Sequence, residues 1–158
     1  MVNETKIMKL FRKANKEYKN GNIMRAKVYQ KIIRLLFSAE IPYSVEIGKG
    51  VDFKHGGLGV VIHEKAIIGD NTIIFQNVTI GGMPDGGVPR IGTNVYIDSG
   101  AVILGGIVVG DNAKIGANAV VLEDIPNNCT AVGIPATIIM NKLGEKNGKN
   151  RNCNILEK

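Results

Sequence analysis

Aliphatic residues recur at every sixth position over much of the chain, and this spacing restricts the fold more than any other feature of the sequence. A small or β-branched residue usually follows four positions after each of them. Gly often comes directly after the leading aliphatic residue and is followed by a polar pair such as Asp-Asn. The leading residues are Ile41, Ile47, Phe53, Ile62, Ile68, Ile74, Ile80, Ile91, Ile97, Ile103, Val109, Ile115 and Val121.

Such hexads predict a parallel β-helix. Successive strand residues point to opposite faces, so the first and fifth residues of a hexad can both point inward while Gly and Asn form the turn. Three flat sides then close a triangular prism, and stacked coils bury a column of identical side chains. A β-sandwich would show turn signals every 8 to 12 residues instead. The composition agrees, since 44% of residues are hydrophobic and only 5% are aromatic.

A short helical hairpin is expected before the repeat. Apolar residues spaced three and four apart predict one amphipathic helix over residues 4–19, and a second apolar run spans 23–37. Asn20-Gly21-Asn22 separates the two, and Pro42 prevents the second from continuing. We therefore expect a hairpin over 1–40, a β-helix over 41–140, and a C-terminal tail over 141–158 whose Asn, Lys and Gly content is typical of disordered segments.

The net charge of +6 does not indicate a nucleic-acid partner. Residues 1–38 carry ten Lys or Arg against two acids, 39–140 carry five against ten, and 141–158 carry five against two. The basic excess thus lies at the two ends, and no nucleic-acid-binding motif accompanies it. No apolar run approaches the roughly 20 residues of a membrane span, and the N-terminus lacks a signal-peptide core. We expect a cytoplasmic protein with no membrane span.

The hexad frame shifts twice, and each shift predicts a loop. The spacing is nine residues between Phe53 and Ile62, and eleven residues between Ile80 and Ile91. Loops that project from a rigid solenoid often carry function. The segments around 54–59 and 81–89 are therefore the candidate sites.

The hexads together with four segments resemble the bacterial hexapeptide-repeat acyltransferases, and within them the serine O-acetyltransferases and their short relatives. The segments are IGKGVDFKHGGLGVVIH, VTIGG, IGTNVYIDSGAVILGGIVVGDNAKIGANAVVLEDIP and VGIPATII. The resemblance implies a mainly β protein with a left-handed parallel β-helix. It also implies a homotrimer or a dimer of trimers, with acetyl-CoA as co-substrate in the groove between neighbouring prisms. The implied reaction makes O-acetylserine and CoA from acetyl-CoA and L-serine, a step of cysteine biosynthesis.

The resemblance assigns the catalytic histidine to His55. One histidine can act first as base and then as acid in acyl transfer. His63, the other histidine, stands at an outward turn position of its hexad and is interpreted as structural. The family also has an acid about one coil earlier that orients the imidazole, and the matching residue is Glu40. Glu40 could instead only cap the junction with the helix.

The resemblance also implies contacts with acetyl-CoA, through small side chains and backbone groups on successive coils. The matching residues are Gly82, Ser99, Gly100 and Ala117.

Two departures from the family pattern leave the acceptor open. Lys54 stands where serine acetyltransferases have an Asp, and Gly87-Val88 precedes Pro89 where an Arg-His pair is usual. A sugar hydroxyl in polysaccharide or cell-surface biosynthesis is the alternative acceptor.

Two other classes of function fit the sequence less well. A β-helix metalloenzyme of the carbonic-anhydrase type needs three histidines for zinc, whereas the chain has two, so no metal is expected. A non-catalytic solenoid that binds ligands would cleave no thioester.

Overall fold

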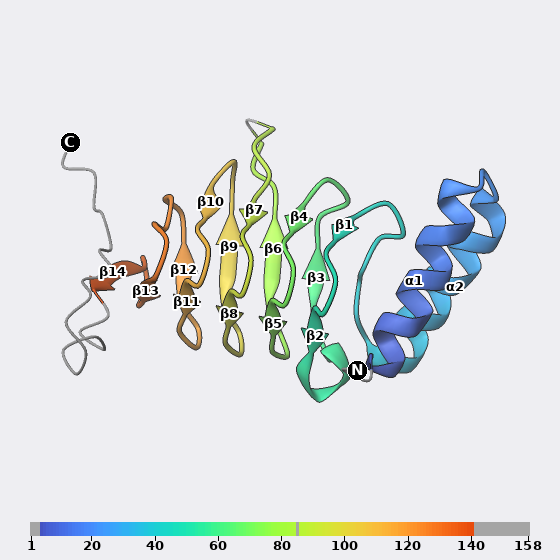
Figure 1. Cartoon of the computed structure of the whole chain (residues 1–158), viewed down its shortest axis with the longest axis horizontal. Helices are drawn as coiled ribbons and strands as arrows, with labels where there is room; N and C mark the ends of the chain where they lie inside the picture. The colour runs from blue at the N-terminus through green and yellow to red at the C-terminus, as the bar shows by residue number, and fades with distance from the viewer. Residues whose placement is uncertain (1–3, 85, 141–158) are drawn as a thin grey trace.

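The computed structural model describes residues 4–84 and 86–140, and it consists of two helices at one end of a column of short strands (Figure 1). The helices are α1 (Lys6–Lys19) and α2 (Ile23–Phe37). The predicted tail over 141–158 lies outside the described residues. Within the described part of the chain, neither helix has the length and apolar character needed to cross a membrane.

The strands form three sheets, one for each side of a prism. Sheet A contains β3 (Val61–Ile62), β6 (Thr79–Gly81), β9 (Val102–Leu104) and β12 (Val120–Val121). Sheet B contains β1 (Glu46–Ile47), β4 (Ile67–Ile68), β7 (Arg90–Ile91) and β10 (Val108–Val109). Sheet C contains β2 (Asp52–Phe53), β5 (Ile73–Ile74), β8 (Tyr96–Ile97), β11 (Lys114–Ile115), β13 (Cys129–Val132) and β14 (Thr137–Met140).

The leading aliphatic residues of the hexads form the core. On sheet C, for example, Phe53 pairs with Ile74, Ile74 with Ile97, and Ile97 with Ile115, all in parallel register and all buried. Equivalent columns line the inner faces of sheets A and B. The predicted fold class is confirmed, because the chain is a parallel β-solenoid of hexapeptide repeats with two N-terminal helices.

Asparagine and glycine have different roles in the turns between sheets B and C. Asn71, Asn94 and Asn112 have φ of 55–57°, the left-handed conformation that Asn tolerates best after Gly. Gly69 instead permits close stacking, since a Cβ there would lie 2.5 Å from the carbonyl oxygen of Gly92 in the next coil. The repeat therefore needs glycine at this position because the coils are close together.

The helical hairpin is fixed to the first coil by both apolar and polar contacts. Ile7 and Phe11 on α1 belong to the same buried cluster as the β-helix core. The Arg12 guanidinium donates hydrogen bonds to the carbonyl oxygens of Ile47, at 2.6 Å, and Gly48. The Asn15 side chain donates to the carbonyl oxygen of Tyr43 at 2.8 Å. The helices thus close one end of the prism.

The opposite end of the solenoid is closed by a strand reversal. β14 pairs with β13 in antiparallel register, with Ala131 opposite Ile138. The hexad pattern does not predict this reversal, because it describes only the parallel coils. The added strand covers the edge that the last coil would otherwise leave unpaired.

Candidate functional site

His55 lies on a sharp bend where the chain passes from sheet C to sheet A. We call residues 54–60 the His55 bend. Three successive residues have positive φ, which are His55 at 51°, Gly56 at 70° and Gly57 at 72°. A histidine in this conformation is strained by roughly 1–2 kcal/mol, and such strain is concentrated at functional sites.

The His55 bend packs against the helical hairpin. A Cβ on Gly57 would lie 2.9 Å from Cδ1 of Ile7, and one on Gly56 would lie 3.5 Å from the Phe37 ring. The His55 ring itself is exposed, with its centroid 5.9 Å from that of Phe75 in the next coil. The bend therefore presents the imidazole to solvent from a well-supported backbone.

Three of the four predicted acetyl-CoA residues lie on the same corner of the prism as His55. Backbone hydrogen bonds join the corner coil by coil, from Asn77 N to Leu58 O at 2.8 Å, then Gly100 N to Gln76 O at 3.0 Å, then Asn118 N to Ser99 O at 2.9 Å. Ala117 belongs to the last of these turns. The structure thus brings Ser99, Gly100 and Ala117 onto one line that begins at the His55 bend.

Gly82 lies on a different corner, between sheets A and B. It begins the segment 82–89 between β6 and β7, which we call the extruded loop and which projects beyond the neighbouring turns (Figure 1). The loop closes on itself through Met83 N to Gly87 O at 3.0 Å and Gly86 N to Met83 O at 2.9 Å. The width of sheet A separates Gly82 from the His55 corner within one chain.

Glu40 makes its side-chain contacts with α2. Its Oε1 accepts a hydrogen bond of 2.7 Å from Gln30 Nε2, and its Oε2 lies 3.1 Å from Arg34 Nη1. Its backbone pairs with the strand after the bend, through Glu40 N to Val60 O at 2.8 Å. Among residues 4–84 and 86–140, no hydrogen bond or ion pair joins Glu40 to His55. The contacts match the capping alternative, and the orienting role stays a prediction.

Three features beside His55 were not predicted. Lys54 Nζ lies 2.6 Å from Oδ2 of Asp52, so the residue before the histidine is part of an ion pair. Phe75 stacks between His55 and Tyr96, whose ring centroid is 5.2 Å away. Gln76 has a buried Oε1 with no hydrogen-bond partner in the described part of the chain. The alternation of strand residues could have predicted that Asp52 and Lys54 lie on one face. The contacts of Phe75 and Gln76 could not be predicted in this way, because they depend on how neighbouring coils are aligned.

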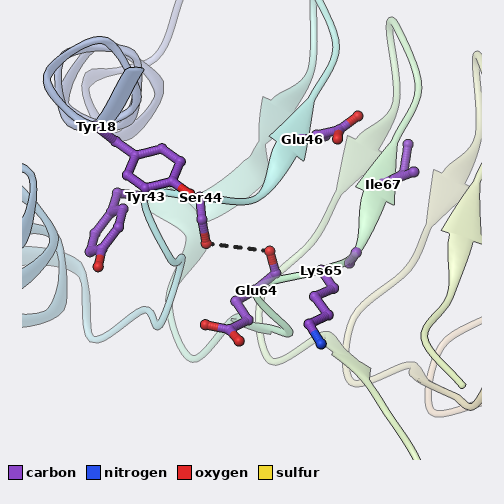
Figure 2. A pocket seen from close by; sticks show the side chains of 8 residues that line it. Tyr18, Tyr43, Ser44, Glu46, Glu64, Lys65 and Ile67 are labelled. Carbon is purple, nitrogen blue, oxygen red and sulfur yellow. Dashed lines mark hydrogen bonds between the residues drawn. The ribbon is translucent and has the colours of Figure 1, made fainter. Parts of the chain in front are cut away.

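One cleft lies away from the predicted residues (Figure 2). It has a volume of about 410 Å³ and is found where the end of α1 meets the first two coils, near sheet B. The rings of Tyr18 and Tyr43 are 5.1 Å apart at one side, and the Ser44 hydroxyl donates to the carbonyl oxygen of Glu64 at 3.4 Å. This cleft contains no histidine, so it offers no base of the kind that acyl transfer uses.

Comparison with known proteins agrees with the solenoid and its repeat. Residues 89–123 match the family model described as bacterial transferase hexapeptide (six repeats). Residues 89–123 therefore carry the hexapeptide repeat of this transferase family. This assignment confirms the resemblance that the sequence motifs suggested.

Individual relatives match most of the length of this chain. A serine acetyltransferase of Synechococcus elongatus is 43% identical over 116 residues, which are 72% of this chain and 47% of the relative. The structure of soybean serine acetyltransferase complexed with serine is 39% identical, with a TM-score of 0.79, over 84% of this chain and 56% of that chain. The structure of serine acetyltransferase from Brucella abortus in complex with coenzyme A is 35% identical, with a TM-score of 0.80. The match covers 84% of this chain and 54% of that chain. The chain spans about half the length of these proteins.

Proposed function

We propose that the chain transfers an acetyl group from acetyl-CoA to the hydroxyl of L-serine, with His55 as general base. The observation that carries the proposal is the exposed His55 on a strained, packed bend, in line with the turns that contain Ser99, Gly100 and Ala117. Support for the reactants comes from relatives named serine acetyltransferase, of which one structure holds serine and another holds coenzyme A.

The proposed reaction needs one side chain that both accepts and donates a proton. His55 takes the proton of the serine hydroxyl as the oxygen attacks the thioester carbonyl carbon. The carbon–sulfur bond then breaks, and the imidazolium returns the proton to the thiolate of CoA. The products are O-acetylserine and CoA, so atoms and charge balance. Such general base catalysis contributes about 10²–10⁴-fold to the rate.

The acetyl-CoA arm would follow the corner that begins at the His55 bend. A pantetheine chain carries amide groups, and these require close approach to backbone and small side chains more than they require charge. Ser99, Gly100 and Ala117 supply small groups at successive coils. Gly82 would contribute to this site from a neighbouring copy.

A homotrimer fits the separation of the two corners. Sheet A lies between the His55 bend and the extruded loop, and its outer face exposes Val61 and Leu122. Burial of such apolar residues favours association.

The exposed Met24, Val28 and Leu35 of α2 could serve a second interface between trimers. Native mass spectrometry gives the stoichiometry, and a monomer at all concentrations would contradict this assembly. The cytoplasmic location stays a prediction.

An acceptor panel tests the proposal. Purified protein is incubated with acetyl-CoA and L-serine, L-homoserine or a hexose, and free thiol is measured over time. Turnover with serine that is lost in His55→Ala supports the proposal. Turnover with hexoses alone would replace serine by the sugar acceptor. No thiol release with any of the acceptors would leave only a binding solenoid.

A further inference from the structure

A second cleft lies beneath the extruded loop, on the corner between sheets A and B. It has a volume of about 240 Å³ and is lined by His63, Lys65, Gly82, Met83, Gly86 and Val88. Pockets for drug-sized molecules usually measure about 300–1,000 Å³, so this cleft suits a single chemical group or one end of a ligand. The sequence motifs gave His63 a structural role only.

The hydrogen bonds of His63 define what it can offer to this cleft. Its Nδ1 accepts a hydrogen bond of 3.2 Å from the backbone N–H of Lys65. The proton of the neutral ring therefore lies on Nε2, which becomes a donor. This edge of the ring faces the loop, because a Cβ on Gly82 would lie 3.3 Å from Cδ2 and 3.4 Å from Nε2. Gly82 leaves that edge uncovered.

Lys65 adds a positive charge that no described carboxylate neutralises. Its side chain is exposed, and within residues 4–84 and 86–140 it takes part in no ion pair. Lys65 lies between the two clefts and also lines the first one, together with Glu46 and Glu64. Figure 2 shows the Glu64 and Lys65 side chains extending in different directions. The cleft beneath the loop thus combines a neutral N–H donor with an ammonium group.

We propose that this cleft binds an anionic oxygen group, either a phosphate or a carboxylate, through Nε2–H of His63 and the ammonium of Lys65. Both donors can contact one oxyanion, and a hydrogen bond from a charged donor is about twice as strong as a neutral one. The glycines of the extruded loop leave room for the group to approach. The site is separate from His55 within one chain.

Two sources of such a group follow if the proposed function holds. The phosphates of CoA and the carboxylate of an amino-acid acceptor carry the same oxyanion chemistry. This assignment of a source rests on the proposed function, whereas anion binding itself does not.

Binding is measured by NMR with inorganic phosphate and, separately, acetate as the probes. The reporters are the His63 ring Cε1–H signal and the Gly82 backbone amide. We expect both to shift on titration, with affinity about tenfold weaker in Lys65→Gln, as for loss of one charge-assisted hydrogen bond. Lys65→Arg should restore binding. His63→Gln, followed through the Gly82 amide, should also weaken it.

The matched control is Lys114→Gln, an exposed lysine on the outer face of β11 that lies outside both clefts. It should bind the probes as wild type does. Gly82→Ala should weaken binding without loss of charge, because the new Cβ contacts the His63 ring and the Gly87 carbonyl oxygen at 3.2 Å. Absence of any shift, or equal affinity in Lys65→Gln and wild type, overturns the proposed site.

Steady-state kinetics then identify the source of the anion. A higher KM for acetyl-CoA alone in Lys65→Gln assigns the site to a CoA phosphate, and a higher KM for the acceptor alone assigns it to a carboxylate. Unchanged values for both would contradict any link to acetyl transfer. Absence of turnover with all acceptors would refute the proposed function and leave the NMR result unaffected.

Discussion

The His55 bend and the extruded loop come from the same kind of sequence signal but have opposite environments. At the bend, a Cβ on Gly57 would contact both Ile7 of α1 and Phe53 of the core. In the loop, a Cβ on Gly86 would meet no atom within 4 Å. The bend packs against a helix and the core. The loop combines hydrogen bonds within itself with close stacking at Gly87, where a Cβ would lie 2.3 Å from the backbone nitrogen of Gly106 in the next coil.

This difference shows how an insertion in a repeat acquires its role. A catalytic side chain must be held in one geometry, and packing against a helix supplies that constraint. A position with few contacts, such as Gly86, opens more easily and can adjust to a ligand. The bend therefore suits the reacting group, and the loop suits a binding group such as the His63 cleft.

Replacing the imidazole should have the largest effect. His55→Ala should lower kcat by about 10²–10⁴-fold, because the hydroxyl then loses its base. The midpoint of thermal unfolding should change little, since the ring is exposed. The thiol-release assay and a melting curve on the same sample check both expectations. Near-normal kcat in the variant would contradict the catalytic assignment.

Two glycine substitutions compare the packing of the bend and the loop directly. Gly57 and Gly86 have φ of 72° and 87°, so alanine is strained at either position. Only Gly57→Ala also overpacks, with Cδ1 of Ile7 at 2.9 Å. We expect a loss of about 3 kcal/mol for Gly57→Ala and about 1 kcal/mol for Gly86→Ala in urea unfolding. Equal losses would show that the bend is no better packed than the loop.

Arg12 helps to attach the helical hairpin to the first coil. Arg12→Met keeps the aliphatic part of the side chain but removes the hydrogen bonds to the Ile47 and Gly48 carbonyl oxygens. We expect a loss of about 2 kcal/mol, as for hydrogen bonds to charged groups. Arg25→Met is the control, because Arg25 is exposed and 3.9 Å from Glu17, and it should cost less than about 0.5 kcal/mol. Similar losses in the two variants would mean that the hydrogen bonds of Arg12 contribute little to holding the hairpin.

The smallest expected effect concerns Glu40. Glu40→Gln retains an oxygen that can accept from Gln30 but removes the charge. If the carboxylate orients His55, kcat should fall by about tenfold with little change in KM or stability, and Glu40→Asp should recover part of it. If Glu40→Gln keeps the wild-type kcat and Glu40→Ala is less stable, the role of Glu40 is structural, through its contacts with α2.

The hexad spacing predicts which residues are buried and where the coils are interrupted, and these expectations agree with the structure for Phe53, Ile74 and Ile97. The spacing cannot predict contacts between coils. Phe75 against His55, and Gly69 against Gly92, each depend on a separation of about one full turn of the solenoid. For this reason, the spacing does not predict that Gly69 is in close contact with the next coil.

The sequence by itself determined the solenoid, because a period of six over many coils leaves few other ways to bury so many small aliphatic side chains. It also nominated both loops, since they interrupt that period, and the family resemblance then assigned the catalytic role to His55. Only the tertiary structure decided that the two loops occupy different corners and that His63 faces Gly82. Which corner an insertion occupies, and which side chain it faces, depends on how the coils stack in three dimensions.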